Sequence, residues 1–139
     1  MSCCSLPSHP KGVAGFVLRF SFGLSLLFVG LKHLMTIDGF SVFVAQDLGA
    51  LAPLGQIWAY VYCVLLIAGG VLFVLGMYKD AAAWAAGLAL GSIPVGMLLK
   101  PILGGVDLSA VMPAVHNTWI WVLVYFFVVK CSCCEGECK

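Results

Sequence analysis

Four long apolar stretches, separated by short polar segments, dominate the pattern of hydrophobic and polar positions along the chain. They cover residues 13–31, 57–77, 81–99 and 113–129, and Arg19 is the one charged residue in the first of them. A helix needs about 20 mostly apolar residues to cross the roughly 30 Å hydrocarbon core of a bilayer. The pattern predicts an all-α fold, an integral membrane four-helix bundle.

The connections between these stretches differ in length. Residues 78–80 form a short polar turn, which makes the second and third helices antiparallel neighbours. Residues 36–56 contain an apolar piece of about one to three helical turns, which is too short to cross a bilayer and is expected to lie in the interface or dip into the bundle. Residues 100–112, with their adjacent glycines, predict an irregular outer loop, and Pro113 suits the first position of the last helix.

The composition supports a membrane protein and excludes several other classes. Of the 139 residues, 63% are hydrophobic and 9% are charged, against roughly 45–50% and about 25% in soluble domains. A net charge of +1 without a basic stripe argues against a nucleic-acid partner. The first apolar stretch exceeds the roughly 7–15 residues of a signal-peptide core and has no small-residue cleavage site after it, so we expect a retained helix.

The distribution of basic residues predicts the orientation. An even number of spans places both termini on the same side, together with the 78–80 turn. That side carries Lys11, Lys79, Lys130 and Lys139, whereas Lys32 and Lys100 lie on the other. By the positive-inside rule both termini are cytoplasmic, and we expect a multi-pass protein of a bacterial or archaeal inner membrane. The expected parts are a tail of residues 1–12, a transmembrane domain of residues 13–130 and a tail of residues 131–139.

Small residues mark the expected contacts between helices. In lipid, close packing of small side chains holds helices together because the hydrophobic effect does not. The candidates are Gly23 and Gly30 in the first helix, Gly69, Gly70 and Gly76 in the second, and Ala83, Gly87 and Gly91 in the third. These positions predict packing faces rather than a functional site.

Polar residues in or near the spans are candidate anchors for a ligand. Arg19 either extends to the lipid head groups or binds an anionic ligand or a quinone carbonyl. Helical spacing places Arg19 and His33 on one face of the first helix, at opposite membrane depths. Lys32, His33 and His116 belong to the outer end of the bundle, where the histidines are either solvated or part of a metal or proton site.

Six of the seven cysteines lie in the two tails. They are Cys3, Cys4, Cys131, Cys133, Cys134 and Cys138. Thiols clustered in a reducing compartment are typical of soft-metal sites or of a redox relay, while an inert tail and lipidation remain alternatives. Cys63 stands alone in the second span and is expected to be a packing residue.

Two segments resemble the DoxX family of membrane proteins. Residues 18–34 (LRFSFGLSLLFVGLKHL) have an Arg early in the first span, a Gly about a turn later and then Phe-x-x-Gly-x-x-Lys, and residues 66–76 (LIAGGVLFVLG) are similar to that family's Gly-rich second span. Arg19 and Lys32 are the matching polar positions. Many members carry a Glu just before the glycine pair of the second span, and residues 63–68 contain none. The Cys-rich tails also fall outside the family pattern.

The resemblance implies a four-helix membrane subunit that works with redox proteins, as in a thiosulfate:quinone oxidoreductase. We therefore expect an accessory subunit linked to thiol or sulfur redox chemistry and to quinone, with the bilayer and another membrane or soluble redox protein as partners. The alternatives are a soft-metal (Cu, Zn or heavy-metal) binding protein that uses the tail cysteines, and a structural small subunit of a larger complex. A homo-oligomer is a further expectation.

Overall fold

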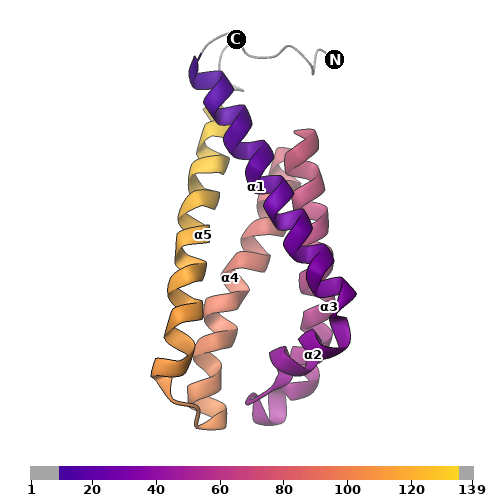
Figure 1. Cartoon of the computed structure of the whole chain (residues 1–139), viewed down its shortest axis with the longest axis vertical. Helices are drawn as coiled ribbons and strands as arrows, with labels where there is room; N and C mark the ends of the chain where they lie inside the picture. Colours follow the sequence, from indigo (N-terminus) through magenta and orange to yellow (C-terminus); the bar gives the residue numbers. More distant parts are fainter. Residues whose placement is uncertain (1–9, 135–139) are drawn as a thin grey trace.

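The computed structural model describes residues 10–134, and this part of the chain is helical apart from short connections. Figure 1 shows four long helices and a short one that lies across one end of the bundle. The elements are α1 (Pro10–Met35), α2 (Ile37–Ala45), the 3₁₀ turn η1 (Gly49–Leu51), α3 (Ala52–Leu75), α4 (Lys79–Gly104) and α5 (Leu108–Cys134).

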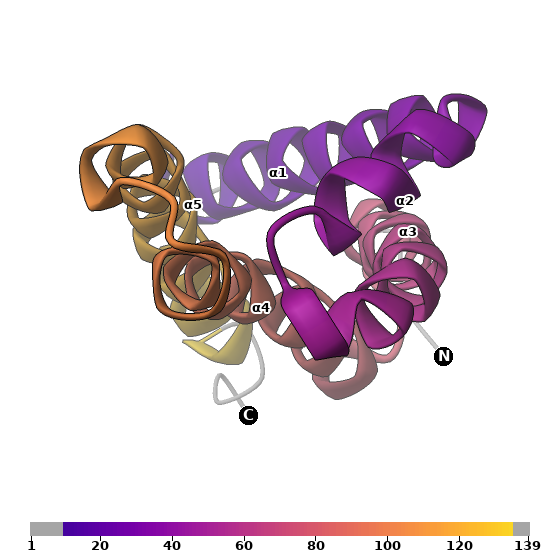
Figure 2. The same ribbon diagram turned by 90° about the horizontal axis from the view of Figure 1, so that it is seen from below.

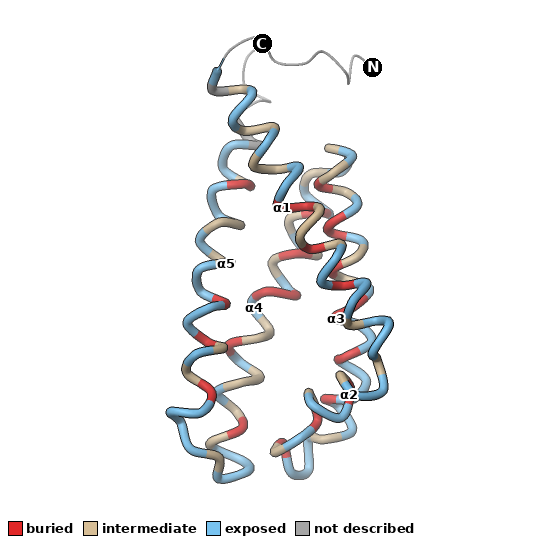
Figure 3. The backbone as a smooth tube through the Cα atoms, viewed as in Figure 1, coloured by how far each residue is buried: buried red, intermediate tan, exposed pale blue. Residues whose placement is uncertain are grey.

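The four long helices are long and apolar enough to cross a membrane. Most of their surface consists of exposed apolar side chains, as in Phe28, Trp84 and Ile120, which are 62%, 72% and 61% exposed. Figure 3 shows that the buried positions face the inside of the bundle and leave the outer faces open. Such a surface suits lipid rather than water. The chain is an all-α, multi-pass membrane protein with a four-helix bundle.

The start of α1 and the end of α5 lie at one end of the bundle, and α2 with η1 lies at the other, which we call the α2 end (Figure 1). Seen from the α2 end, α2 and η1 lie between α1, α3 and α4 (Figure 2). The main packing partners are α1 with α3, α3 with α4, α4 with α5 and α2 with α3. This arrangement confirms that the second and third spans are neighbours.

The tightest contact between helices joins α1 to α3. A Cβ added at Gly23 would lie 2.9 Å from the carbonyl oxygen of Gly70, and a Cβ at Gly70 would lie 2.7 Å from that of Gly23. Further along α1, a Cβ at Gly30 would lie 2.9 Å from side-chain atoms of Leu66 and Ile67. The two backbones therefore approach one another where side chains are absent, as the small-residue pattern predicted.

The contact between α3 and α4 uses alanine as well as glycine. Gly69 faces Ala85 and Ala86, with 3.2 Å between its added Cβ and the Ala86 nitrogen, and Ala82 and Ala86 are fully buried. The predicted stripe on α4 is wrong in part. A Cβ at Gly91 would meet nothing within 4 Å, so this glycine borders open space instead of a helix.

The expected irregular loop over residues 100–112 is also wrong. Helix α4 continues through Pro101 to Gly104, and the connection to α5 spans residues 105–107. Gly105 ends α4 in the left-handed conformation with φ 67°, which costs glycine little. The side chain of Asp107 accepts a hydrogen bond from the Ser109 nitrogen at 3.0 Å, and α5 starts there.

Three prolines of the described residues lie inside helices, contrary to a simple helix-stop rule. Pro94 and Pro101 lie within α4, and Pro113 lies within α5 instead of at its first position. Proline is tolerated in transmembrane helices because neighbouring groups satisfy the freed carbonyl. The second span likewise begins earlier than expected, with a proline in the first turn of α3.

The Gly23–Gly70 contact leads to a stability prediction. Gly70→Ala places a methyl group against backbone atoms of α1, which cannot move aside as a flexible side chain would. We expect a loss of about 1–3 kcal/mol in the free energy of unfolding, the range typical of overpacking. Unfolding of the detergent-solubilised protein with dodecyl sulfate, followed by circular dichroism, measures the change.

The control is Gly39→Ala in α2, because a Cβ there would meet nothing within 4 Å. This variant should stay within about 0.5 kcal/mol of the parent. Equal stability of the two variants would contradict the close α1–α3 packing.

Candidate functional site: a cavity at the α2 end

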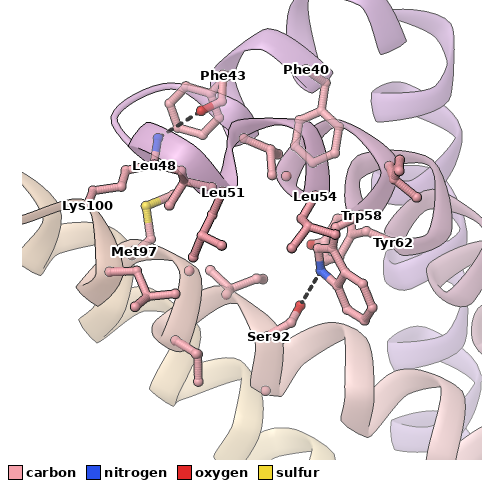
Figure 4. Close-up of a pocket in the computed structure, with 18 of the residues that line it drawn as sticks. Phe40, Phe43, Leu48, Leu51, Leu54, Trp58, Tyr62, Ser92, Met97 and Lys100 are labelled. Carbon is pink, nitrogen blue, oxygen red and sulfur yellow. Dashed lines mark hydrogen bonds between the residues drawn. The ribbon is translucent and has the colours of Figure 1, made fainter. Parts of the chain in front are cut away.

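A cavity of about 740 Å³ lies at the α2 end between α2, η1, α3 and α4. Its volume falls in the range of roughly 300–1,000 Å³ that is typical of small-molecule sites. Figure 4 shows its side chains from α2, α3 and α4 around a common space. The lining residues include Phe40, Phe43, Leu48, Leu51, Leu54, Trp58, Tyr62, Gly91, Ser92, Gly96, Met97, Lys100 and, from α1, His33.

The cavity exists because α3 and α4 pack closely near Gly69 and diverge toward the α2 end (Figure 1). On the α4 side, Gly91 and Gly96 line the open part, and a Cβ at either glycine would meet nothing within 4 Å. The short elements α2 and η1 cover part of the gap between the two helices. Small residues that hold helices together elsewhere therefore leave a space here.

The cavity opens sideways as well. Leu54 and Ile57 on α3 and Val95 on α4 line it, yet they are 62%, 62% and 61% exposed. These residues belong to helices that are apolar enough to span a membrane. The opening is thus an apolar one on the flank of the bundle, which is a suitable entry for a molecule dissolved in lipid.

A hydrogen bond connects the two helices that flank the cavity. The indole nitrogen of Trp58 on α3 donates to the hydroxyl oxygen of Ser92 on α4 at 3.1 Å (Figure 4). That hydroxyl donates in turn to the carbonyl oxygen of Ala89 at 2.8 Å. The bond fixes the indole ring at the cavity wall.

An aromatic group forms the wall near α1. The His33 and Phe40 rings stack with centroids 4.1 Å apart, and the Tyr62 ring lies 5.6 Å from Phe40 and 6.1 Å from His33. Tyr62 is 7% exposed. The imidazole and the phenol are two polar groups on a wall that is otherwise apolar.

Lys100 is the charged residue of the cavity. It is 6% exposed, and its Nζ donates to the carbonyl oxygen of Phe43 at 2.7 Å. The same ammonium group lies 4.5 Å from the centroid of the Phe43 ring, a cation–π contact. Lys100 thereby joins the end of α4 to α2 (Figure 4).

The predicted site residues are dispersed. His33 lines the cavity, whereas Lys32 and His116 are exposed and do not line it. Arg19 lies near the opposite end of the bundle, so these residues do not form one site. The spacing predicted that Arg19 and His33 share one face of α1, and in the structure this face packs on α3.

Arg19 lies at the C-terminal end of α3. A Cβ added at Gly76, which ends α3 with φ 68°, would lie 2.9 Å from the guanidinium Nη2. The end of a helix carries a partial negative charge on its unpaired carbonyl groups, so a cation is favourable there. The guanidinium also lies 5.7 Å from the Phe16 ring. This environment stabilises the charge of the half-buried Arg19 side chain.

The cysteine predictions fall mostly beyond the described structure. Cys3, Cys4 and Cys138 lie outside residues 10–134, and the side chains of Cys133 and Cys134 lie outside what the structure describes. Cys131 is an exposed free thiol, and Cys63 is a fully buried one, which confirms its packing role. Within the described residues, no group of three or more His, Cys, Asp or Glu side chains could hold a metal ion.

Sequence reasoning missed the residues that shape the cavity. The sequence pattern assigns no site role to Trp58, and it places Lys100 in an expected outer loop. The sequence did contain a sign that Lys100 belongs to a helix, because Lys100 directly follows the apolar stretch of residues 81–99. In the structure, Lys100 and Pro101 both lie in α4. No feature of the sequence around Ser92 indicated that its side chain would bond to Trp58.

No protein family model, curated protein or solved structure matches this chain. The fold and the cavity define its class: a multi-pass, all-α membrane protein with an apolar cavity that opens on its flank. The resemblance to the DoxX family stays a prediction.

The Trp58–Ser92 bond predicts the effect of removing its acceptor. Ser92→Ala leaves the indole N–H without its partner, and we expect a loss of about 1 kcal/mol in unfolding free energy. The fluorescence of Trp58 should also change, because the indole loses its fixed environment. Ser25→Ala is the control, since that hydroxyl bonds to its own helix at Ser21; an equal effect of both changes would argue against the bond between α3 and α4.

The position of Arg19 leads to a second prediction. Arg19→Met removes the charge beside the end of α3 and should lower unfolding free energy by about 1–2 kcal/mol. Ligand affinity of the cavity should not change, because Arg19 does not line it. Parallel measurements of unfolding and binding separate the two roles, and a loss of binding at unchanged stability would restore Arg19 as a ligand anchor.

Proposed function

We propose that this chain is a membrane subunit that binds a lipid-soluble organic molecule with a polar head in the cavity at the α2 end. The observation that carries the proposal is the sideways opening of an apolar cavity with a few polar groups on its walls. Such a combination is typical of sites in which apolar surface supplies affinity and polar groups fix the orientation.

A quinone is the ligand expected if the chain serves redox chemistry. The His33, Phe40 and Tyr62 rings offer a surface for stacking, and the phenol and ammonium groups offer donors to carbonyl oxygens. In this form of the proposal, the subunit holds quinone for a partner that oxidises thiols or sulfur compounds, and the tail cysteines exchange thiols with that partner or dock it. The partner and the redox step come from the DoxX resemblance.

A filled cavity provides the test. Gly91→Leu places a side chain in open space at the cavity wall, so it should abolish binding and preserve the fold. Binding is measured by the quenching of Trp58 fluorescence with a short-chain benzoquinone, in a protein whose other three tryptophans are changed to phenylalanine. We expect saturable quenching in the parent and at least a tenfold loss of affinity, about 1.4 kcal/mol, in the variant.

The matched control is Gly39→Leu, a change of the same size at a position that also has open space and does not line the cavity. Its quenching curve should equal that of the parent. Quenching that rises linearly with quinone in all three proteins would show partition into detergent and would contradict quinone binding.

A further inference from the structure

Lys100 is placed unusually for a lysine in a membrane protein. It is 6% exposed, and it lines the cavity near the end of a helix that is apolar enough to span a membrane. A buried ammonium group is costly unless its charge and its donors are compensated. The contacts of the Lys100 ammonium group therefore indicate which charge a ligand of the cavity carries.

The protein compensates Lys100 in part. Its Nζ has three N–H donors, and within residues 10–134 one of them has a hydrogen-bond acceptor, the carbonyl oxygen of Phe43. The Phe43 ring stabilises the positive charge from one side at 4.5 Å. Asp47 is the acidic residue that acts electrostatically on Lys100, but the described residues form no ion pair between them. The structure shows no acceptor among the described residues for the other two donors, and Lys100 is one of the residues that line the cavity.

The surroundings of Lys100 are apolar. Leu48, Leu51 and Met97 lie between Lys100 and the Trp58 side of the cavity (Figure 4). A molecule with its head at Lys100 would extend its tail along these side chains and reach the exposed flank between α3 and α4. The polar group is thus at one end of an apolar space, an arrangement that fits an amphipathic ligand.

We infer that the molecule in the cavity is an amphipathic anion whose negatively charged head accepts hydrogen bonds from Lys100 and whose apolar chain lies between α3 and α4. The inference rests on the proposed binding function and adds the charge of the ligand to it. A carboxylate gains a charge-assisted hydrogen bond and an opposite charge, whereas a quinone carbonyl gains a hydrogen bond to a neutral oxygen. Lys100 therefore favours the anion.

A pair of ligands that differ in head charge tests the inference. The probes are an octadecanoic acid brominated at mid-chain and the corresponding brominated alcohol, because bromine quenches Trp58 on contact. The protein retains Trp58 as its single tryptophan and is held in uncharged detergent at a pH where the acid is ionised. We expect the acid to bind at least about tenfold more tightly than the alcohol.

Variants of Lys100 test whether this residue causes the preference for the acid over the alcohol. Lys100→Met retains an apolar side chain of similar length and should reduce the acid's affinity to that of the alcohol, while Lys100→Arg should retain the preference. Lys32→Met is the matched control, since Lys32 is exposed and does not line the cavity. If Lys100→Met does not fold, the acid–alcohol comparison in the parent and in Lys100→Arg still decides the question.

The outcomes separate the two proposals. Equal affinity for acid and alcohol in the parent overturns the inference but leaves the binding function intact. Quenching by neither probe also overturns the inference, and the separate benzoquinone titration then decides whether the binding function stands. A carboxylate and a lipid phosphate share the required chemistry, so a third titration uses a brominated phosphatidylglycerol. Lys100-dependent binding of this lipid identifies a membrane phospholipid as the anion. If the acid binds and this lipid does not, the anion is a free fatty acid.

Discussion

The close approach of α1 and α3 at Gly23 and Gly70 is the constraint on which the rest of the structure depends. A methyl group on either glycine would press on the other helix's backbone. In lipid, apolar side chains gain nothing by leaving the solvent, so the bundle depends on contacts of this kind. The contact also sets the position of α1 along α3, and this brings His33 to Phe40 and Tyr62 at the α2 end.

The same type of residue has opposite consequences at the two ends of the α3–α4 pair. Gly69 lies against Ala85 and Ala86, where small residues face small residues and the backbones meet. Gly91 faces no helix, because α3 has diverged and α2 with η1 lies between the two helices. A glycine on a membrane helix thus marks close packing only where the partner helix is near. The Trp58–Ser92 and Lys100–Phe43 bonds connect the walls where packing does not.

The number of spans and the packing face of α1 could be predicted from the sequence, because both depend on local pattern, whereas the partner of that face could not. The apolar stretches defined the four helices, and the steps from Arg19 through Gly23 and Gly30 to His33 defined the packed face. The end of α4 could not be predicted, since Lys100-Pro101 has the local character of a loop and its burial depends on α2, which is remote in the sequence. The cavity could not be predicted from the sequence either, because it results from the divergence of α3 and α4 in space.

The two cations Arg19 and Lys100, one half-buried and one buried, have different surroundings in the bundle. Arg19 lies against the C-terminal end of α3, where the helix dipole provides a partial negative charge. Lys100 lies within α4, before the helix ends at Gly104, and the backbone offers it a single carbonyl oxygen from α2. Arg19 stood out in the sequence because it interrupts a span, and it acts within the fold. Lys100 stands at the edge of a span in the sequence, and in the structure it lines the cavity while its ammonium group contacts Phe43 of α2.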